Sequence, residues 1–246
     1  MLNRALKVRD HAAGTDSYTR PIDIPSTVRY DAIVFDMDGV LVTGYETPAT
    51  VYERAAALTM RAFAHPEPAP TALIDPDDAD HVRRTCREFE LPAGSAWGYR
   101  ERAASQFEHE LIETGDRVAF PDAAVLAELA DHYRIGIASN NRHDTVEFCI
   151  SWFEWTEYID AFRGRAPSLE DYDRMKPDPA YLEHVVEALG ASRPLFVGDR
   201  ASDIRTAERL ECDAAYLERD QSAPELTVEP TMRLESLADL PDRLAE

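Results

Sequence analysis

The chain has 246 residues, 44% of them hydrophobic, which is enough for one large domain or for a core with a second unit inserted into it. Its net charge of −21 excludes nucleic acid and anionic membranes as partners, because both repel an acidic surface. We expect a cytoplasmic protein with reduced thiols, since the three cysteines are widely spaced and neither an apolar signal segment nor a membrane-length apolar run is visible.

Lysine is nearly absent from the chain. It occurs only at Lys7 and Lys176, and arginine supplies the other basic side chains. A strongly acidic surface of this kind is typical of proteins from salt-loving microbes, so the composition predicts a halophilic protein; an ordinary acidic cytoplasmic protein is the alternative. Any site for an anionic substrate needs local positive charge to overcome the charge of the whole molecule.

The first half of the chain is predicted to contain one strand and several helices. Residues 1–29 mix charged residues with Thr, Ser and Pro without a sustained period, and we expect an irregular N-terminal arm. A short apolar strand follows at residues 32–35. The segment 45–119 shows helical periodicity and no convincing strand, with helices expected over 48–64, 77–89 and 95–112.

The second half alternates between helices and strands. Strands are expected over 135–138, 161–162, 195–197, 214–217 and 232–234, and helices over 121–130, 143–155, 179–189, 201–210 and 237–244. This alternation predicts an α/β fold with a doubly wound, Rossmann-like parallel sheet. The core would comprise residues 30–44 and 120–246, with the helical segment 45–119 inserted into it.

Polar side chains follow three of the expected strands. Asp36 and Asp38 come directly after the first strand, Ser139 and Asn140 after the second, and Asp199 after a third. Ligands of such sheets bind outside the carboxyl ends of the strands, so we expect these residues to face one site. Two carboxylates at the end of a buried strand are costly unless a cation or a reaction requires them.

Four short motifs carry a resemblance to a known family. They occupy residues 36–40 (DMDGV), 139–140 (SN), 176–179 (KPDP) and 198–203 (GDRASD). With all four in order, the sequence resembles the hydrolases of the haloacid dehalogenase superfamily over about residues 30–220. The helical segment between the first two motifs is similar to the small cap domain of the phosphoglycolate phosphatase and β-phosphoglucomutase branch, which implies a cap at 45–119.

The resemblance implies a catalytic role for three residues. Asp36 would be the nucleophile that forms an aspartyl-phosphate, and Asp38 the general acid and base. Lys176 would supply the positive charge beside the nucleophile and the phosphate. Ser139 and Asn140, with Lys176, would bind the phosphate oxygens.

The resemblance also implies Mg²⁺ as the cofactor, an ion that prefers oxygen ligands. Its ligands would be Asp36, the backbone carbonyl of Asp38, and Asp199. Asp203 would hold a water of the ion or orient the neighbouring groups.

The implied activity is Mg²⁺-dependent hydrolysis of a small phosphorylated metabolite, similar to phosphoglycolate or a sugar phosphate. Asp38 favours phosphatases over dehalogenases, which have no acidic residue at this position. A phosphomutase of the β-phosphoglucomutase type and a non-catalytic regulator that binds metal or phosphate are the alternatives. Residues 42–45 lack the acidic–Ser pair often found in this branch, so the substrate stays open.

Four further residues are candidates for supporting roles in the implied cap. Arg100 and Arg102 are candidates for reading the substrate, and Gly44 and Gly115 are candidate hinges.

Overall fold

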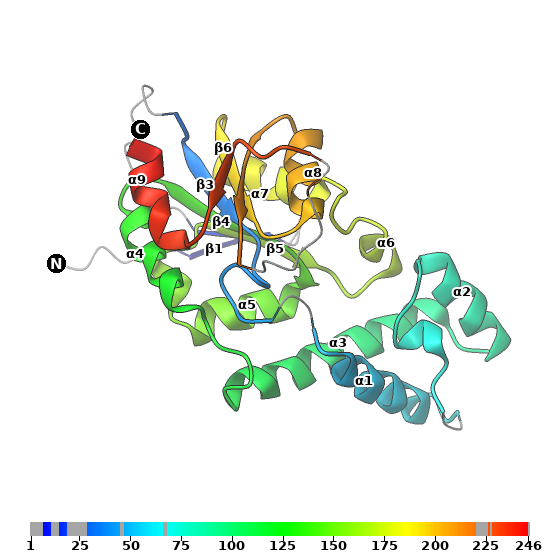
Figure 1. The fold of residues 1–246 in the computed structure, drawn as a ribbon. Coiled ribbons are helices and arrows are strands. Elements are labelled where there is room, and N and C mark those ends of the chain that lie inside the picture. Colours follow the sequence, from blue (N-terminus) through cyan, green and yellow to red (C-terminus); the bar gives the residue numbers. More distant parts are fainter. Residues whose placement is uncertain are drawn as a thin grey trace.

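The structure, a computed structural model, describes residues 7–10, 15–18, 29–44, 47–65, 68–219, 226 and 228–245. The strands in these ranges form one sheet in the order β1-β2-β5-β4-β3-β6-β7-β8 (Figure 1). Its six parallel strands are β3 (Ala32–Phe35), β4 (Arg134–Arg142), β5 (Ala161–Arg165), β6 (Pro194–Gly198), β7 (Asp213–Leu217) and β8 (Met232–Leu234). The predicted doubly wound parallel sheet is therefore confirmed.

Helices cover both faces of this sheet. Side chains alternate along a strand, so Ile33 and Phe35 of β3 enter one core while Ala32 and Val34 enter the other. The first core is closed by α4 (Val125–Ala130), α5 (His143–Trp152) and α9 (Leu240–Ala245), and the second by α7 (Ala180–Leu189) and α8 (Ala201–Arg209). None of the described helices combines the length and the apolar character needed to cross a bilayer.

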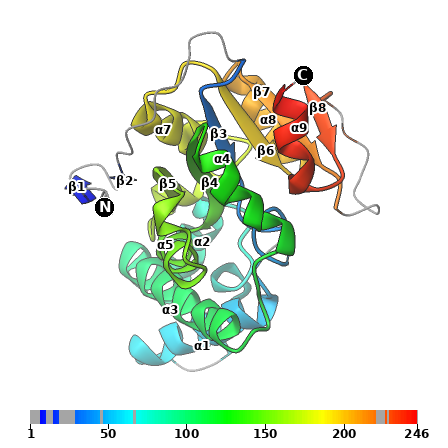
Figure 2. The ribbon, with the colours of Figure 1, turned by 90° about the vertical axis from the view of Figure 1, so that its left-hand side faces the viewer.

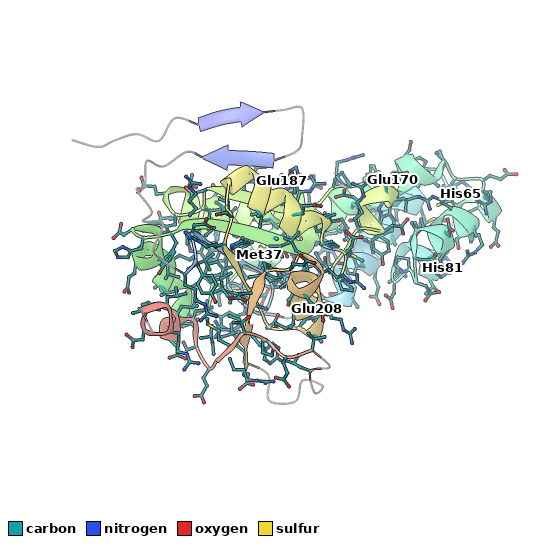
Figure 3. The ribbon with its side chains drawn as sticks, turned by 90° about the horizontal axis from the view of Figure 1, so that it is seen from above. Met37, His65, His81, Glu170, Glu187 and Glu208 are labelled. Carbon is teal, nitrogen blue, oxygen red and sulfur yellow. The ribbon has the colours of Figure 1, made fainter. Side chains whose placement is uncertain are left out.

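The segment between β3 and α4 forms a helical unit to one side of the sheet (Figure 2). Its helices are α1 (Ala49–Ala62), α2 (Ala79–Glu88) and α3 (Ala93–Glu113), with a short 3₁₀ turn, η1 (Thr71–Leu73). Met60, Val82 and Trp97 belong to a third apolar cluster, which also includes Leu169 from outside this segment. Seen from above, His65 and His81 lie far from Met37, which follows β3 in the middle of the α/β unit (Figure 3). The limits 45–119 stay a prediction.

The expectation of an irregular arm over residues 1–29 is wrong for two segments. β1 (Lys7–Asp10) and β2 (Thr15–Tyr18) pair antiparallel, and β2 pairs with β5 at Asp16–Phe162 and Ser17–Ala161. The free edge of β5 offers unpaired backbone groups, which a strand can satisfy without any apolar period in its sequence. Of the remaining residues of the arm, only Arg29 lies within the described ranges, and it pairs with Asp213 at 3.2 Å.

Other element boundaries differ modestly from the expected ones. β4 is longer than predicted because it continues through the polar residues 139–142. The helix expected over 143–155 ends at Trp152, and the left-handed backbone of Glu154 separates it from η3 (Trp155–Glu157). The 3₁₀ turns η2 (Pro121–Ala124) and η4 (Leu237–Asp239) begin the helical segments expected at 121 and 237, and the short helix α6 (Leu169–Tyr172) was not predicted.

Candidate active site

Asp36 sits at the carboxyl end of the central strand. Its backbone N–H donates to the carbonyl of Val197 in β6 at 2.9 Å, and its Oδ1 accepts from the N–H of Met37 at 2.8 Å. The chain then turns sharply at Gly39, whose φ of 80° favours glycine, and the Gly39 N–H donates to the carbonyl of Val42 at 2.9 Å. The Asp36 side chain is thus fixed by the strand before it and the turn after it.

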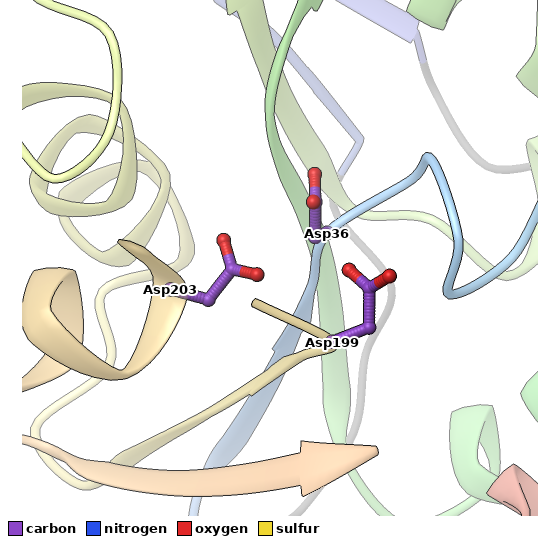
Figure 4. A group of neighbouring side chains, drawn as sticks. All are labelled: Asp36, Asp199 and Asp203. Carbon is purple, nitrogen blue, oxygen red and sulfur yellow. The ribbon is translucent and has the colours of Figure 1, made fainter. Parts of the chain in front are cut away.

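Asp199 and Asp203 come from the neighbouring β6–α8 connection. The Asp203 side chain packs against Gly198 so closely that a Cβ on that glycine would lie 2.3 Å from the Cβ of Asp203. Oδ2 of Asp203 accepts from the N–H of Arg200 at 3.0 Å. All three carboxylates, those of Asp36, Asp199 and Asp203, are buried and have oxygens within 4.8 Å of one another (Figure 4).

Lys176 lies between two of these carboxylates. Its Nζ is 2.8 Å from Oδ1 of Asp36 and 2.6 Å from Oδ1 of Asp203. Burial alone would lower the pKa of Lys176, but the charges of Asp203 and Asp36 outweigh it and raise that pKa, so the ammonium stays charged. One ammonium faces three carboxylates, which leaves this part of the site with an excess of negative charge.

The three carboxylates fit a divalent cation. Both oxygens of Asp199 are buried without a hydrogen-bond partner among the described residues. Burial, together with the neighbouring carboxylates of Asp36 and Asp203, raises the pKa of Asp199 to about 8. A site made of carboxylate oxygens with uncompensated negative charge matches the preference of Mg²⁺ for oxygen ligands.

The carboxylate of Asp38 has a different environment. It accepts a hydrogen bond from Nη2 of Arg117 at 2.6 Å and another from Nδ2 of Asn141 at 2.8 Å. It is not a member of the group of carboxylates that could hold a metal among the described residues. The proposed metal contact of its backbone carbonyl stays a prediction.

Arg117 and Asn141 were missed by sequence reasoning. Asn141 directly follows the Ser139–Asn140 motif, and this position could have marked it as a candidate site residue. Arg117 lies 79 residues from Asp38 in the sequence, and no local pattern marks it.

A buried carboxylate on α3, Glu108, joins the same network. Its Oε1 accepts from Arg117 and from Asn141, and its Oε2 accepts from Arg142 and from Thr47. Arg142 is the last residue of β4. Glu108 therefore connects the helical unit to the sheet and, through Arg117 and Asn141, to Asp38.

Ser139 and Asn140 of the second motif have different roles. Ser139 is fully buried, lines the cavity beside Asp36, and accepts the N–H of Asn141 at 3.2 Å, which leaves its hydroxyl hydrogen available to a ligand. The side-chain amide of Asn140 instead holds the backbone of Lys176, accepting its N–H at 2.7 Å and donating to its carbonyl at 3.4 Å. Asn140 thus positions the lysine, while it also lines the cavity.

One cavity of about 230 Å³ brings these residues together. The predicted residues that line it are Asp36, Asp38, Ser139, Asn140, Lys176 and Asp203. Tyr52 and Arg100 of the helical unit close it, together with Arg165 at the end of β5. Arg102, in contrast, is exposed and does not line this cavity. Both candidate hinge glycines, Gly44 and Gly115, have positive φ.

Comparison with known proteins agrees with the motifs. A family model described as haloacid dehalogenase-like hydrolase matches residues 30–210. A phosphoglycolate phosphatase from Cereibacter sphaeroides is 34% identical over 87 residues. That match covers 35% of this chain and 38% of the relative, so it spans well under half the length of either protein.

Solved structures share the fold at low sequence identity. CbbY from Rhodobacter sphaeroides, in complex with phosphate, has a TM-score of 0.59 at 19% identity and covers 86% of this chain and 96% of its own. A predicted phosphoglycolate phosphatase from Haemophilus somnus scores 0.58 at 18% identity, covering 88% and 99%. A 2-haloacid dehalogenase from Pseudomonas syringae also scores 0.58, at 22% identity, covering 87% and 98%. Likeness to enzymes of such different chemistry supports the fold alone.

Proposed function

This chain belongs to the haloacid dehalogenase-like hydrolase family, and from that premise we propose that it is a Mg²⁺-dependent phosphatase acting on a small phosphorylated metabolite. The observation that carries the proposal is the arrangement around Asp36. A buried carboxylate at the end of β3 lies 2.8 Å from the Lys176 ammonium and within 4.8 Å of two further carboxylates. This set offers a nucleophile, positive charge for a phosphoryl group and ligands for a cation in one cavity.

In the first step, an oxygen of Asp36 attacks the phosphorus of the ester. The bond from phosphorus to the leaving oxygen breaks, and that oxygen takes a proton from the carboxyl group of Asp38. An alcohol leaves and the phosphoryl group stays on Asp36 as an acyl phosphate. Lys176 and the hydroxyl of Ser139 stabilise the charge on the phosphoryl oxygens.

In the second step, the Asp38 carboxylate takes a proton from a water molecule that attacks the same phosphorus. The bond between phosphorus and the Asp36 oxygen breaks, which releases inorganic phosphate and regenerates both carboxyl groups in their starting states. The hydrogen bonds from Arg117 and Asn141 hold Asp38 in place for both proton transfers.

Asp36, Asp199 and Asp203 would hold the Mg²⁺ ion, with the Asp38 carbonyl as a further ligand. When bound, the ion supplies charge stabilisation for the phosphoryl oxygens and offsets the repulsion among the carboxylates. The helical unit would act as a cap, because Tyr52 and Arg100 line the same cavity as the predicted nucleophile, and a cap of this kind limits the access of water. A cavity of about 230 Å³ suits a small metabolite.

The test is hydrolysis of p-nitrophenyl phosphate by purified protein with Mg²⁺. Asp36→Asn should abolish phosphate release, because an amide is a poor nucleophile. Asp31→Asn is the matched control, since Asp31 immediately precedes the other end of the same strand and bonds the backbone of Ser192 and Arg193. Undiminished turnover by Asp36→Asn would refute the mechanism. In a second assay with a sugar phosphate as the substrate, formation of an isomer without free phosphate would indicate a phosphomutase instead.

A further inference from the structure

Arg165 has unused hydrogen-bonding capacity beside the cavity. It is the last residue of β5, is 4% exposed and lines the same cavity as Asp36. Its Nη2 lies 2.9 Å from Oε2 of Glu101, but its Nη1 meets only the thioether sulfur of Met175, at 3.0 Å. Its Nε has no hydrogen-bond partner among the described residues. A thioether is a weak acceptor, so this buried guanidinium is poorly satisfied.

Arg100, which lines the cavity from the helical unit, is better satisfied. Arg100 donates through Nε to the carbonyl of Leu73 at 2.9 Å and through Nη2 to the carbonyl of Ile74 at 2.8 Å. Its Nη1 pairs with Glu101. All three nitrogens of Arg100 are engaged within the protein, so its role at the cavity is structural.

The surroundings of Arg165 carry an excess of positive charge. Arg100, Arg142 and Arg165 share two buried carboxylates, Glu101 and Glu108, and Glu108 also pairs with Arg117. The ring of Tyr52 lies over this cluster, with the guanidinium carbon of Arg100 4.1 Å from its centre. Burial would raise the pKa of Tyr52, but the charges of Arg142, Arg165 and Arg100 outweigh burial and lower it. In a protein of net charge −21, this buried patch favours an anion.

We propose that Arg165 binds a second anionic group of the substrate, so that the enzyme prefers phosphate esters that also carry a carboxylate or another phosphate. The proposal rests on the function proposed above, because it assigns a further contact within that site. The phosphate under attack lies at Asp36 and Lys176, while the second anion meets the poorly satisfied N–H groups of Arg165 in the lining of the same cavity.

An uncharged group would not satisfy Arg165 equally well. A carboxylate or phosphate can accept two parallel hydrogen bonds from a guanidinium, and its negative charge also compensates the excess charge of the cluster. A hydroxyl at the same place can accept hydrogen bonds but leaves that charge uncompensated. The expected preference for an anionic over a neutral ester of similar shape is about 10- to 100-fold in kcat/KM.

Three substrates separate the possibilities. 2-Phosphoglycolate carries a carboxylate, 2-hydroxyethyl phosphate carries a neutral hydroxymethyl group in its place, and ethylene bisphosphate carries a second phosphate. The measured quantity is the ratio of kcat/KM for the carboxylate-bearing ester, or for the bisphosphate, to that for the hydroxyethyl ester. A high ratio for the first compound identifies a carboxylate site, and a high ratio for the third identifies a phosphate site.

Two neighbouring substitutions should change this ratio in opposite directions. Arg165→Met removes the proposed contact and should lower the ratio about 10- to 100-fold, whereas Glu101→Gln frees Arg165 from its carboxylate and should raise it. Arg102→Met, on the same helix as Glu101 but exposed and outside the cavity, should leave the ratio unchanged. If neither variant folds, the ratio of kcat/KM values for the unmodified protein still tests the proposal, because equal hydrolysis of the three esters would overturn it.

The outcomes distinguish this proposal from the function on which it rests. Equal hydrolysis of all three esters by the unmodified protein, or a ratio that neither substitution changes, would overturn the role of Arg165 and leave the phosphatase intact. Failure to hydrolyse any ester, p-nitrophenyl phosphate included, would overturn both. A high ratio that falls in Arg165→Met or rises in Glu101→Gln supports the proposal.

Discussion

Replacing Glu108 by glutamine tests the link between the helical unit and the sheet. The side chain of Glu108 is fully buried, and both of its oxygens accept hydrogen bonds from donors that cannot act as acceptors, the guanidinium groups of Arg117 and Arg142. Glutamine conserves the shape but places an NH₂ group against one of these donors. It also removes the charge that compensates two buried guanidiniums.

The expected cost is large because the network is buried. Breaking a buried ion pair by removing one partner costs about 3–5 kcal/mol, against a total stability of about 5–15 kcal/mol for a typical domain. Glu110→Gln, two residues along α3, is the matched control. Glu110 pairs with Arg54 at 2.9 Å, but both side chains are about half exposed, and such surface pairs contribute about 0–1 kcal/mol.

Urea unfolding followed by tryptophan fluorescence measures the difference. With a slope of about 2.5 kcal/mol per M, Glu108→Gln should lower the unfolding midpoint by about 1–2 M and Glu110→Gln by less than about 0.4 M. The variant should also lose phosphatase activity, since Arg117 and Asn141 bond both Glu108 and Asp38. If the two variants unfold at the same urea concentration, the network around Glu108 does not stabilise the fold.

Three further outcomes are expected. Mg²⁺ at 100 times its Kd should raise the free energy of unfolding by about 2.7 kcal/mol, which is measured as a rise in melting temperature. Asp199→Asn should lose most of this rise, and an equal rise in the variant would show that Asp199 is not a ligand. Raising KCl from 0.1 to 2 M should raise the melting temperature, because 47 acidic side chains face only 26 basic ones, and a fall would contradict the halophilic interpretation. Burial raises the pKa of Cys149 to about 12 and that of Cys212 to about 11, so both thiols stay protonated at pH 8, and mass spectrometry should find neither alkylated by iodoacetamide until the protein is unfolded.

The sequence predicts the parts of the site that depend on the backbone. Asp36, Ser139 and Asp199 each come at or near the end of an apolar run in the sequence. Parallel strands have their carboxyl ends at one edge of the sheet, so the pattern of apolar runs followed by polar residues predicts that these three lie close together. Lys176 was found through a motif and through the scarcity of lysine in the chain.

The parts of the site that depend on tertiary packing of side chains were not predictable from the sequence. Glu108 and Arg117 look like surface charges in the sequence, because the helix that carries Glu108 is polar over much of its length. Only packing of α3 against α5 and the end of β4 buries them and selects their partners. The pairing of β2 with β5 was missed for a related reason, since it uses backbone groups that every residue has.

The position of β3 has a consequence for the dynamics of the site. β3 is hydrogen-bonded to β4 on one side and to β6 on the other, and it is fully buried. Its amide hydrogens should therefore exchange with solvent only when the whole domain unfolds, whereas the helical unit, whose described residues add no strand to the sheet, can open at lower free energy. The two walls of the cavity would then belong to cooperative units of different stability, so that substrate can enter and product can leave while the strand that carries Asp36 stays rigid.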